Sequence, residues 1–221
     1  MAVIVLLGAP GAGKGTQAGA IGRHLGIPHV ATGDLFRAAV SEGSSIGREA
    51  RRYMERGQLV PDDITIRMLL DRLGQADAAG GAVLDGFPRT RAQAAVLDEA
   101  LAESGSRVDL ALLIHVPAED VVRRLSGRWI CQAAGHVYHI TANPPQVEGV
   151  CDLDGSPLVQ RTDDREETIR ARLAGQLGAL EEVVDHYRGR RVLRTVDGTQ
   201  PIDAVSDALL AELPAAPGTR T

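Results

Sequence analysis

The apolar run Val3-Ile-Val-Leu-Leu7 leads directly into the glycine-rich run Gly8-Ala-Pro-Gly-Ala-Gly-Lys-Gly-Thr16. A short, continuous apolar run predicts a strand that is buried on both faces of a parallel sheet. Residues 16–25 predict a helix, so the glycine-rich run connects the end of a strand to the start of a helix. Backbone N–H groups in such a loop, together with the helix N-terminus, bind phosphate oxygens. The stretch therefore predicts an α/β fold with a phosphate-binding loop.

Lys14 is the only lysine among the 24 lysine and arginine residues of the chain, and it lies inside this loop. A lysine ammonium is compact and can turn toward two phosphates, whereas the planar guanidinium of arginine is too wide for the loop. Gly15 follows Lys14 where a generic phosphate loop has a Ser or Thr that binds magnesium, and Thr16 comes next. This departure argues against a GTPase or a motor ATPase.

The rest of the chain alternates between apolar runs and helical patterns, which predicts a doubly wound parallel sheet. Further strands are expected at 82–84, 110–116 and 192–196, and helices at 62–73, 91–103, 118–125, 166–187 and 202–213. We expect residues 214–221 to be frayed.

Two stretches interrupt the alternation. Residues 32–60 have helical composition without an obvious core strand, and Gly43, Gly47 and Gly57 are expected to break them. Residues 127–161 are rich in Gly, Pro, His and Cys, with a β-like piece at 136–140. A long excursion of this kind predicts a small inserted subdomain or a lid, because plain loops of that length are uncommon.

Composition limits the classes of function. With 221 residues and a net charge of -5, the chain can form a large core and has no basic face for nucleic acid. Its two cysteines favour a reducing compartment. The opening apolar run is too short for a signal peptide, and no run approaches membrane-spanning length. We therefore expect a soluble cytoplasmic protein with no nucleic-acid or membrane partner.

A second motif, Asp85-Gly-Phe-Pro-Arg89, follows the predicted strand at 82–84. An acid at the carboxyl end of a parallel strand lies at the ligand-binding edge of the sheet, where it can hold the water around a magnesium ion. Arg89 offers a bidentate clamp for phosphate.

Five motifs in order resemble those of adenylate kinase. They are the glycine-rich loop, Thr32-Gly-Asp-Leu-Phe-Arg37, Gln58-Leu-Val-Pro61, Asp85-Gly-Phe-Pro-Arg-Thr90 with Gln93, and Asn143-Pro-Pro145. The insertion at 127–161 is similar to that of the long-lid bacterial form, and the resemblance extends from about Val3 to about Leu213. It implies an α/β core (1–30, 61–126 and 165–221), a helical nucleoside monophosphate (NMP) binding subdomain (31–60) and a small β-rich lid (127–164).

The resemblance also implies the reaction ATP + AMP ⇌ 2 ADP with Mg²⁺. Because nothing in the sequence suggests an obligate oligomer, we expect a monomer. The resemblance implies ATP binding by Gly11, Ala12, Gly13, Lys14, Gly15, Thr16, Arg124, Arg128, Val137, Tyr138 and Gln200. It implies AMP binding by Thr32, Arg37, Gln58, Leu59, Val60, Gly86, Phe87, Pro88, Arg89, Gln93, Arg161 and Arg172. It implies catalytic roles for Lys14, Asp85, Arg89, Arg128, Arg161 and Arg172.

Two positions depart from the family pattern. Gln200 stands where a lysine is common. In the lid, zinc-bearing relatives have a Cys-x₂-Cys pair followed by Cys-x₂-Cys or Cys-x₂-Asp, but here Ala134 replaces the second cysteine. Two interpretations stay open: zinc bound by the set Cys131, His136, Cys151 and Asp154, or a metal-free lid held by packing and hydrogen bonds.

Two other functions compete with adenylate kinase. A pyrimidine (CMP or UMP) monophosphate kinase shares the loop and the Asp-Gly-Phe-Pro-Arg motif, although the long lid and Gln93 argue against it. A non-catalytic nucleotide-binding module is the alternative from another class, but such a protein has no need for the full set of arginines.

Overall fold

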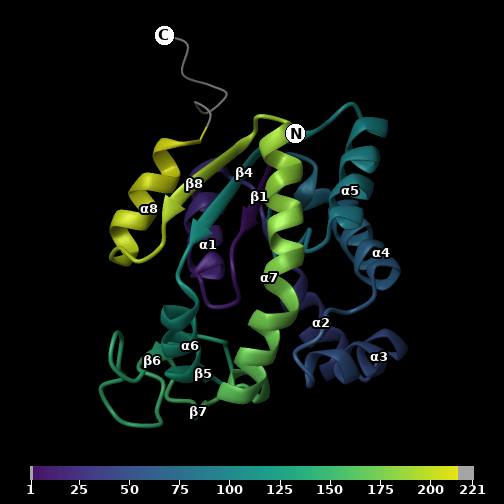
Figure 1. Ribbon diagram of the computed structural model, residues 1–221. Helices are drawn as coiled ribbons and strands as arrows, with labels where there is room; N and C mark the ends of the chain where they lie inside the picture. Colours follow the sequence, from purple (N-terminus) through teal and green to yellow (C-terminus); the bar gives the residue numbers. More distant parts are fainter. Residues whose placement is uncertain (1, 214–221) are drawn as a thin grey trace.

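Five parallel strands form the central sheet of the computed structural model, which describes residues 2–213 (Figure 1). These strands are β1 (Ala2–Leu7), β2 (His29–Ala31), β3 (Gly81–Asp85), β4 (Val108–His115) and β8 (Leu193–Asp197). Their order across the sheet is β2-β3-β1-β4-β8, and every neighbouring pair is parallel. The predicted doubly wound α/β sheet is confirmed.

Helices connect these strands and also build the first insertion. They are α1 (Lys14–Leu25), α2 (Thr32–Ser41), α3 (Ser45–Met54), α4 (Asp62–Leu73), α5 (Arg91–Glu103), α6 (Ala118–Ser126), α7 (Glu166–Gly189) and α8 (Ile202–Ala211), with short 3₁₀ turns η1 (Ala76–Ala78) and η2 (Thr162–Asp164). Every predicted helix is present within one or two residues of its expected bounds. The helix α1 begins at Lys14 itself, two residues before its expected start.

In the first insertion and its surroundings, one strand was missed and one expectation was wrong. The strand β2 was not predicted, because it is only three residues long and gives too little pattern to recognise. Gly47 does not break a helix but lies inside α3, where a Cβ would come 2.0 Å from the carbonyl oxygen of Ala39 on α2. The glycine therefore allows α2 and α3 to pack closely. The residues expected to be frayed, 214–221, lie outside the described range.

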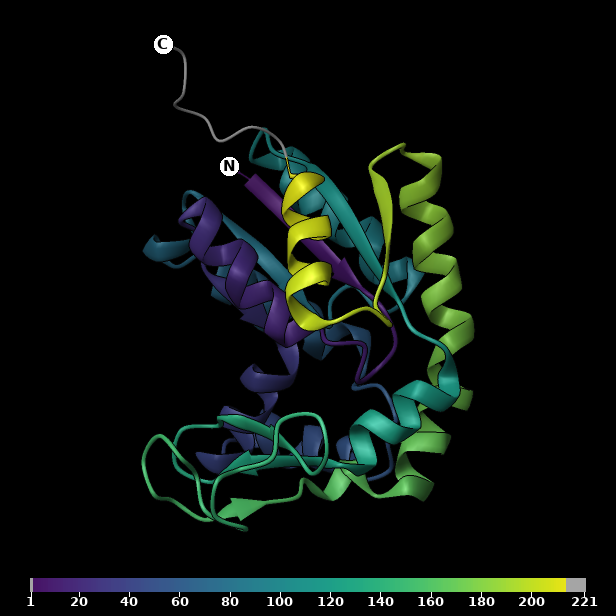
Figure 2. The same ribbon diagram turned by 90° about the vertical axis from the view of Figure 1, so that its left-hand side faces the viewer.

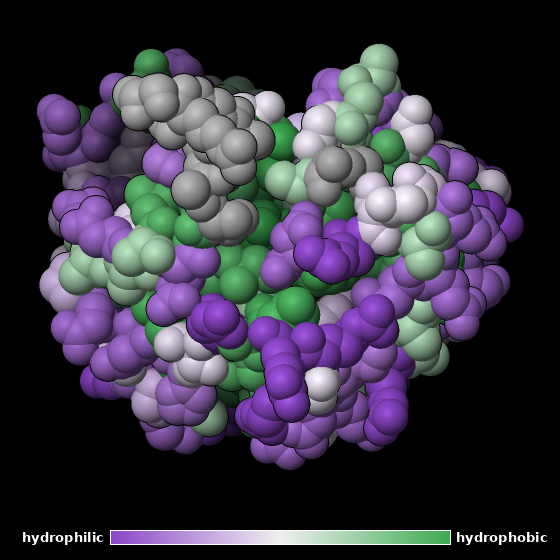
Figure 3. Space-filling view, turned by 90° about the horizontal axis from the view of Figure 1, so that it is seen from above, coloured by the Kyte–Doolittle hydropathy of each residue, from purple (hydrophilic) through white to green (hydrophobic). Residues whose placement is uncertain are grey.

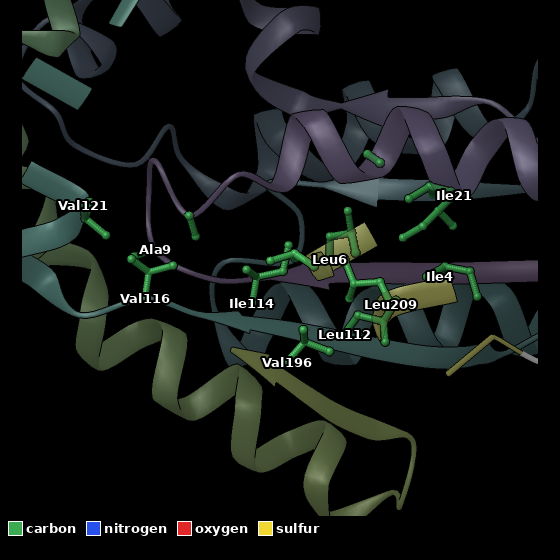
Figure 4. Packing of buried hydrophobic residues seen from close by; sticks show 14 of the residues in the cluster. Ile4, Leu6, Ala9, Ile21, Leu112, Ile114, Val116, Val121, Val196 and Leu209 are labelled. Atoms are coloured by element: carbon green, nitrogen blue, oxygen red, sulfur yellow. The ribbon is translucent and has the colours of Figure 1, made fainter. Parts of the chain in front are cut away.

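The core lies on both faces of the sheet, as the pattern of β1 predicts. Ile4 and Leu6 point to one face, where they belong to a buried cluster with residues of α1, α6 and α8 (Figure 4). Val3, Val5 and Leu7 point to the other face, into a second cluster with residues of α5 and α7. All five side chains are at most 2% exposed, so β1 is the centre of the hydrophobic core.

Both insertions lie at the end of the molecule toward which the strands of the central sheet run (Figures 1 and 2). The helices α2 and α3 form one of them. The other is a three-stranded antiparallel sheet in the order β6-β5-β7, made of β5 (Arg128–Cys131), β6 (Val137–His139) and β7 (Leu158–Val159). The predicted small β-rich insertion is confirmed. Parallel α/β sheets bind ligands at the carboxyl ends of their strands, so the site is expected between these two insertions.

The end of the molecule opposite the two insertions exposes hydrophobic residues. Figure 3 shows hydrophobic residues at the centre of this face with hydrophilic residues around them. Within residues 2–213, no helix is both long enough and apolar enough to cross a membrane.

Candidate active site

The phosphate-binding loop closes tightly onto the carboxyl end of the sheet. Gly8 has a φ of 145°, and a Cβ there would lie 2.7 Å from the carbonyl oxygen of Ile114 on β4. Gly13 caps α1 with a φ of 97°, in the left-handed region that glycine adopts without strain. The loop therefore presents the N-terminus of α1 at the edge where β1 and β4 end, and this helix end favours bound anions.

The ammonium group of Lys14 folds back over the loop. Its Nζ donates hydrogen bonds to the carbonyl oxygens of Gly8 and Ala9, each at 2.9 Å. Burial lowers the pKa of Lys14 to about 8, and although nearby Asp85 opposes this change, the positive charges of Arg89 and Arg172 add to it. The ammonium is thus held in a desolvated position among charged groups.

Asp85 ends β3 directly beside the loop. A Cβ on Gly15 would lie 3.5 Å from Asp85 Oδ2, so the missing side chain leaves this carboxylate open toward the loop. Burial tends to raise the pKa of Asp85, but two neighbours lower it more. They are His29 on β2, whose Nε2 lies 3.4 Å from Asp85 Oδ2, and Lys14. The pKa of Asp85 therefore lies below its ordinary value. An ionised carboxylate oxygen at this edge fits magnesium, which prefers oxygen ligands.

A cavity between α2, the loop before α4 and the N-terminus of α5 contains most of the residues assigned to AMP. It is lined by Thr32, Arg37, Gln58, Leu59, Val60, Gly86, Arg89, Gln93 and Arg172, together with residues that the sequence did not suggest, among them Asp163 and Gln176. Phe87, Pro88 and Arg161 are not part of this lining. Phe87 is 1% exposed and packs in the core beneath the cavity.

Hydrogen bonds order the floor of this cavity. Thr32 Oγ1 and Arg89 Nε both donate to the carbonyl oxygen of Gly86, at 2.8 and 2.7 Å. The backbone N–H of Arg89 donates to Gln93 Oε1 at 2.7 Å, and Gln93 Nε2 donates to Asp62 Oδ1 at 2.7 Å. The guanidinium and the amide are therefore oriented before any ligand binds.

Two adjacent acids bind Arg128 and Arg172. Arg128 forms a bidentate pair with the buried carboxylate of Asp164, at 2.7 and 2.6 Å. Arg172 Nη1 donates to Asp163 Oδ2 at 3.0 Å. Paired charges of this kind are far less costly to bury than single ones.

The cations of the site lower one another's pKa values. Burial lowers the pKa of Arg89 to about 10, with Arg172 as the next cause. Burial likewise lowers the pKa of Arg161 to about 10, with Arg37 and Arg128 as the next causes. Such mutual repulsion marks a site suited to a polyanion.

Two residues assigned to ATP lie at the edge of the core. Arg124 on α6 donates to the carbonyl oxygen of Gly198 at 2.8 Å, which joins α6 to the turn after β8. Gln200, in place of the common lysine, is exposed and donates to Asp197 Oδ2 at 3.0 Å. Both side chains are bound to the same turn.

Val137 and Tyr138, the two residues of β6 assigned to ATP, point in opposite directions. Val137 is 53% exposed, whereas Tyr138 is 5% exposed and packs inside the lid. The hydroxyl of Tyr138 accepts a hydrogen bond from the backbone N–H of Asp152 at 2.8 Å. The side chain of Tyr138 is therefore mostly enclosed by the lid.

Sequence reasoning missed Asp62, Asp163, Asp164 and Gln176. The pair Asp163-Asp164 comes two residues after Arg161, and acids so close to phosphate-binding arginines were a signal that could have found them. Asp62 and Gln176 gave no such signal, because their partners Gln93 and Gly57 are distant in the chain.

The four candidate metal ligands lie together in the lid. Cys131, His136, Cys151 and Asp154 place one donor atom each within 4.8 Å of all the others. Each cysteine begins a similar turn, closed by a 2.9 Å hydrogen bond from the N–H of Gly135 or Gly155 to the cysteine carbonyl.

The spacing of these donors fits zinc. The closest pairs are Cys131 Sγ and Asp154 Oδ2 at 3.1 Å, and His136 Nδ1 and Cys151 Sγ at 3.2 Å. Tetrahedral zinc with bonds of about 2.0–2.3 Å places its ligands roughly 3.3–3.8 Å apart. A slight expansion of this cluster would accommodate the ion.

A phosphate-binding loop at the edge of a parallel sheet, beside a cavity lined with arginines, defines a phosphate-loop protein that binds nucleotides. The family model described as adenylate kinase matches residues 6–192. An adenylate kinase of Streptomyces griseus is 49% identical, with 96% of this chain and 97% of that protein covered. One from Clostridium perfringens is 50% identical over 93% of this chain and 95% of its own length. The chain belongs to the adenylate kinase family, so the resemblance in the sequence motifs is confirmed.

The lowered pKa of Lys14 predicts a pH dependence of stability. Between about pH 8, its pKa in the folded protein, and 10.5, its ordinary value, the unfolded chain binds more protons than the folded protein does. The free energy of unfolding should therefore rise with pH in this window, relative to that of Lys14→Met. Allowing for the partial exposure of the side chain, we expect a difference of about 1 to 3 kcal/mol.

Urea titrations of the wild type and Lys14→Met at pH 7 and pH 10, without nucleotide, measure this difference. The exposed Arg67 on α4 provides a control, because Arg67→Met should follow the wild type at both pH values. Equal changes in the wild type and Lys14→Met would contradict a desolvated ammonium.

Proposed function

We propose that the chain transfers a phosphoryl group reversibly from MgATP to AMP, giving two ADP, as its family does. The main support for this proposal is that the cation of the phosphate-binding loop lies close to the cations of the cavity. Lys14 of the loop and Arg89 and Arg172 of the cavity are near enough for each charge to affect the pKa of another. A phosphate bound by the loop would therefore lie beside a second phosphate bound in the cavity.

The loop and the lid side would bind ATP. Backbone N–H groups of the loop and the end of α1 would hold the phosphates, and Lys14 would turn from the carbonyl groups of Gly8 and Ala9 toward the β- and γ-phosphates. Arg124, Gln200 and the exposed Val137 would contact the rest of the nucleotide.

The cavity would bind AMP. Arg37 and Arg89 would bind its phosphate, and Gln93 would bind its base through the paired donor and acceptor of the amide. In the absence of nucleotide, Arg37 is paired with Asp34, so phosphate would replace this acid.

Charge and alignment would supply the catalysis. Phosphoryl transfer needs reacting groups in line and positive charge on the migrating group, with no covalent partner from the protein. This charge would come from Lys14, Arg89, Arg128, Arg161 and Arg172. The acids Asp163 and Asp164 would keep Arg172 and Arg128 in position until phosphate oxygens arrive.

Magnesium accompanies ATP in this family. Asp85 is the residue that would hold it, because its carboxylate is ionised and faces the loop beside Gly15. The ion, when bound, would neutralise charge on the phosphates.

The insertions would act as movable parts around a fixed core. Residues 31–60 would form the NMP-binding subdomain and residues 127–164 the lid, with the core from 1–30, 61–126 and 165–221. Closure of the lid would exclude water, which otherwise competes with AMP for the phosphoryl group. We also propose that the protein is a cytoplasmic monomer, which gel filtration would test.

Replacement of the lone lysine tests the proposed function. Lys14→Arg should lower kcat for ADP formation from ATP and AMP by at least roughly a hundredfold, because the guanidinium does not fit between the loop carbonyls. The melting temperature should stay near that of the wild type. The exposed Arg67→Lys serves as the matched control and should retain full activity. Retention of most activity by Lys14→Arg would refute the steric argument.

We further propose a structural zinc ion in the lid, bound by Cys131, His136, Cys151 and Asp154. The wild type should then contain about one zinc per chain. His136→Ala should lose the metal and lower the melting temperature, since one of four ligands is gone. His139→Ala, a second histidine change in the lid, should retain it.

Elemental analysis and thermal melts of the three proteins measure both effects. A wild type that contains no zinc after expression with zinc, and whose melting temperature a chelator leaves unchanged, would favour the metal-free lid.

A further inference from the structure

Asp62 lies outside the lining of the AMP cavity but is hydrogen-bonded to a residue that lines it. It is the first residue of α4. Its Oδ1 accepts from Gln93 Nε2 at 2.7 Å, and its Oδ2 accepts from Thr90 Oγ1 at 2.9 Å. These bonds connect the start of α4 to the start of α5.

The neighbours of Gln93 determine which way its amide faces. A carboxylate can only accept hydrogen bonds, and a backbone N–H can only donate. Asp62 therefore requires the amide nitrogen on its side, while the N–H of Arg89, 2.7 Å from Oε1, requires the amide oxygen on the other. Gln93 is 1% exposed, so water cannot readily replace either partner. The amide has one allowed orientation.

We propose that Asp62 is a positioning residue that fixes this orientation of Gln93 and thereby makes the cavity select adenine over 6-oxopurines. The inference rests on the proposed function, in which Gln93 binds the base of the acceptor nucleotide.

The selection of adenine follows from the hydrogen-bonding groups of the Gln93 amide that remain unpaired. After its bonds to Asp62 and Arg89, the amide of Gln93 keeps one N–H and one lone pair for a ligand. Adenine offers an acceptor at N1 and a donor at N6, which complement this pair. Hypoxanthine, the base of IMP, has a donor at N1 and an acceptor at O6. The same orientation would therefore place donor against donor and acceptor against acceptor.

IMP would fit only if the amide turned over. A turned amide would point its oxygen at the carboxylate of Asp62 and its nitrogen at the N–H of Arg89. Buried polar groups left without partners carry a large cost, which is how hydrogen-bonding sites reject close analogues.

Thr90 fixes which oxygen of Asp62 remains for Gln93, because its hydroxyl donates to the other one. The hydroxyl of Thr90 accepts from the backbone N–H of Gln93 at 3.1 Å, so its single hydrogen is free for Asp62. In Asp62→Asn, the new side chain could accept from Thr90 with its oxygen and present its nitrogen to Gln93. That arrangement would stabilise the turned amide.

The experiment compares kcat/KM for AMP and IMP, with ATP as donor, in four proteins: the wild type, Asp62→Asn, Asp63→Asn and Gln93→Ala. Asp62→Asn should lower the AMP-to-IMP ratio on the order of tenfold, the effect of about one misplaced buried hydrogen bond. The change should come mainly from KM rather than kcat. Asp63 is the exposed acid next to Asp62 in the same helical turn, so Asp63→Asn should keep the wild-type ratio.

Two outcomes would overturn the inference, and they differ. If Asp62→Asn lowers kcat/KM equally for AMP and IMP while Gln93→Ala reduces the ratio, Asp62 is merely structural and the proposed AMP site stands. If Gln93→Ala leaves the ratio unchanged, Gln93 does not bind the base, and this part of the proposed function fails as well. Thermal melts establish that each variant is folded. Asp62→Ser, which also frees the amide, provides the same test should Asp62→Asn not fold.

Discussion

Repulsion among neighbouring buried cations is the constraint on which this site depends. Lys14, Arg89, Arg161 and Arg172 all have pKa values below their ordinary range, with burial as the largest cause and neighbouring cations among the others. A protein holds such a cluster together only if other groups supply negative charge. In the protein without nucleotide, acids such as Asp163 partly do so, and nucleotide phosphates would complete the neutralisation.

The fold brings these charges together from distant parts of the chain. The loop after β1 supplies Lys14, the end of β3 supplies Asp85, and α7 supplies Arg172. A parallel sheet makes this convergence possible because all of its strands end at the same edge. The proposed recognition of the base has a different physical origin, since it would depend on the direction of the hydrogen bonds around Gln93 rather than on the number of charges.

Local patterns predicted most of the fold, and long-range pairing accounts for what was missed. The run of β1, the loop and the helices at 62–73 and 91–103 follow from neighbouring residues alone. Most of the residues assigned to AMP do line one cavity, but they come from several motifs that are distant in the chain, and only the family resemblance indicated that these motifs meet. In contrast, the pairing of Gln93 with Asp62 could not be deduced, since a hydrogen bond between residues 31 positions apart leaves no periodic pattern. The three-residue strand β2 left too short a pattern to detect.

The central claim is that phosphate charge relieves the repulsion among the buried cations of the site. Thermal melts with tripolyphosphate and with adenosine, each titrated at low and at high salt, test it most directly. We predict that tripolyphosphate alone raises the melting temperature by several degrees, by mass action on a charged site, and that salt reduces this effect by screening. Adenosine should give a smaller rise that is insensitive to salt. A larger stabilisation by adenosine than by tripolyphosphate would contradict the account.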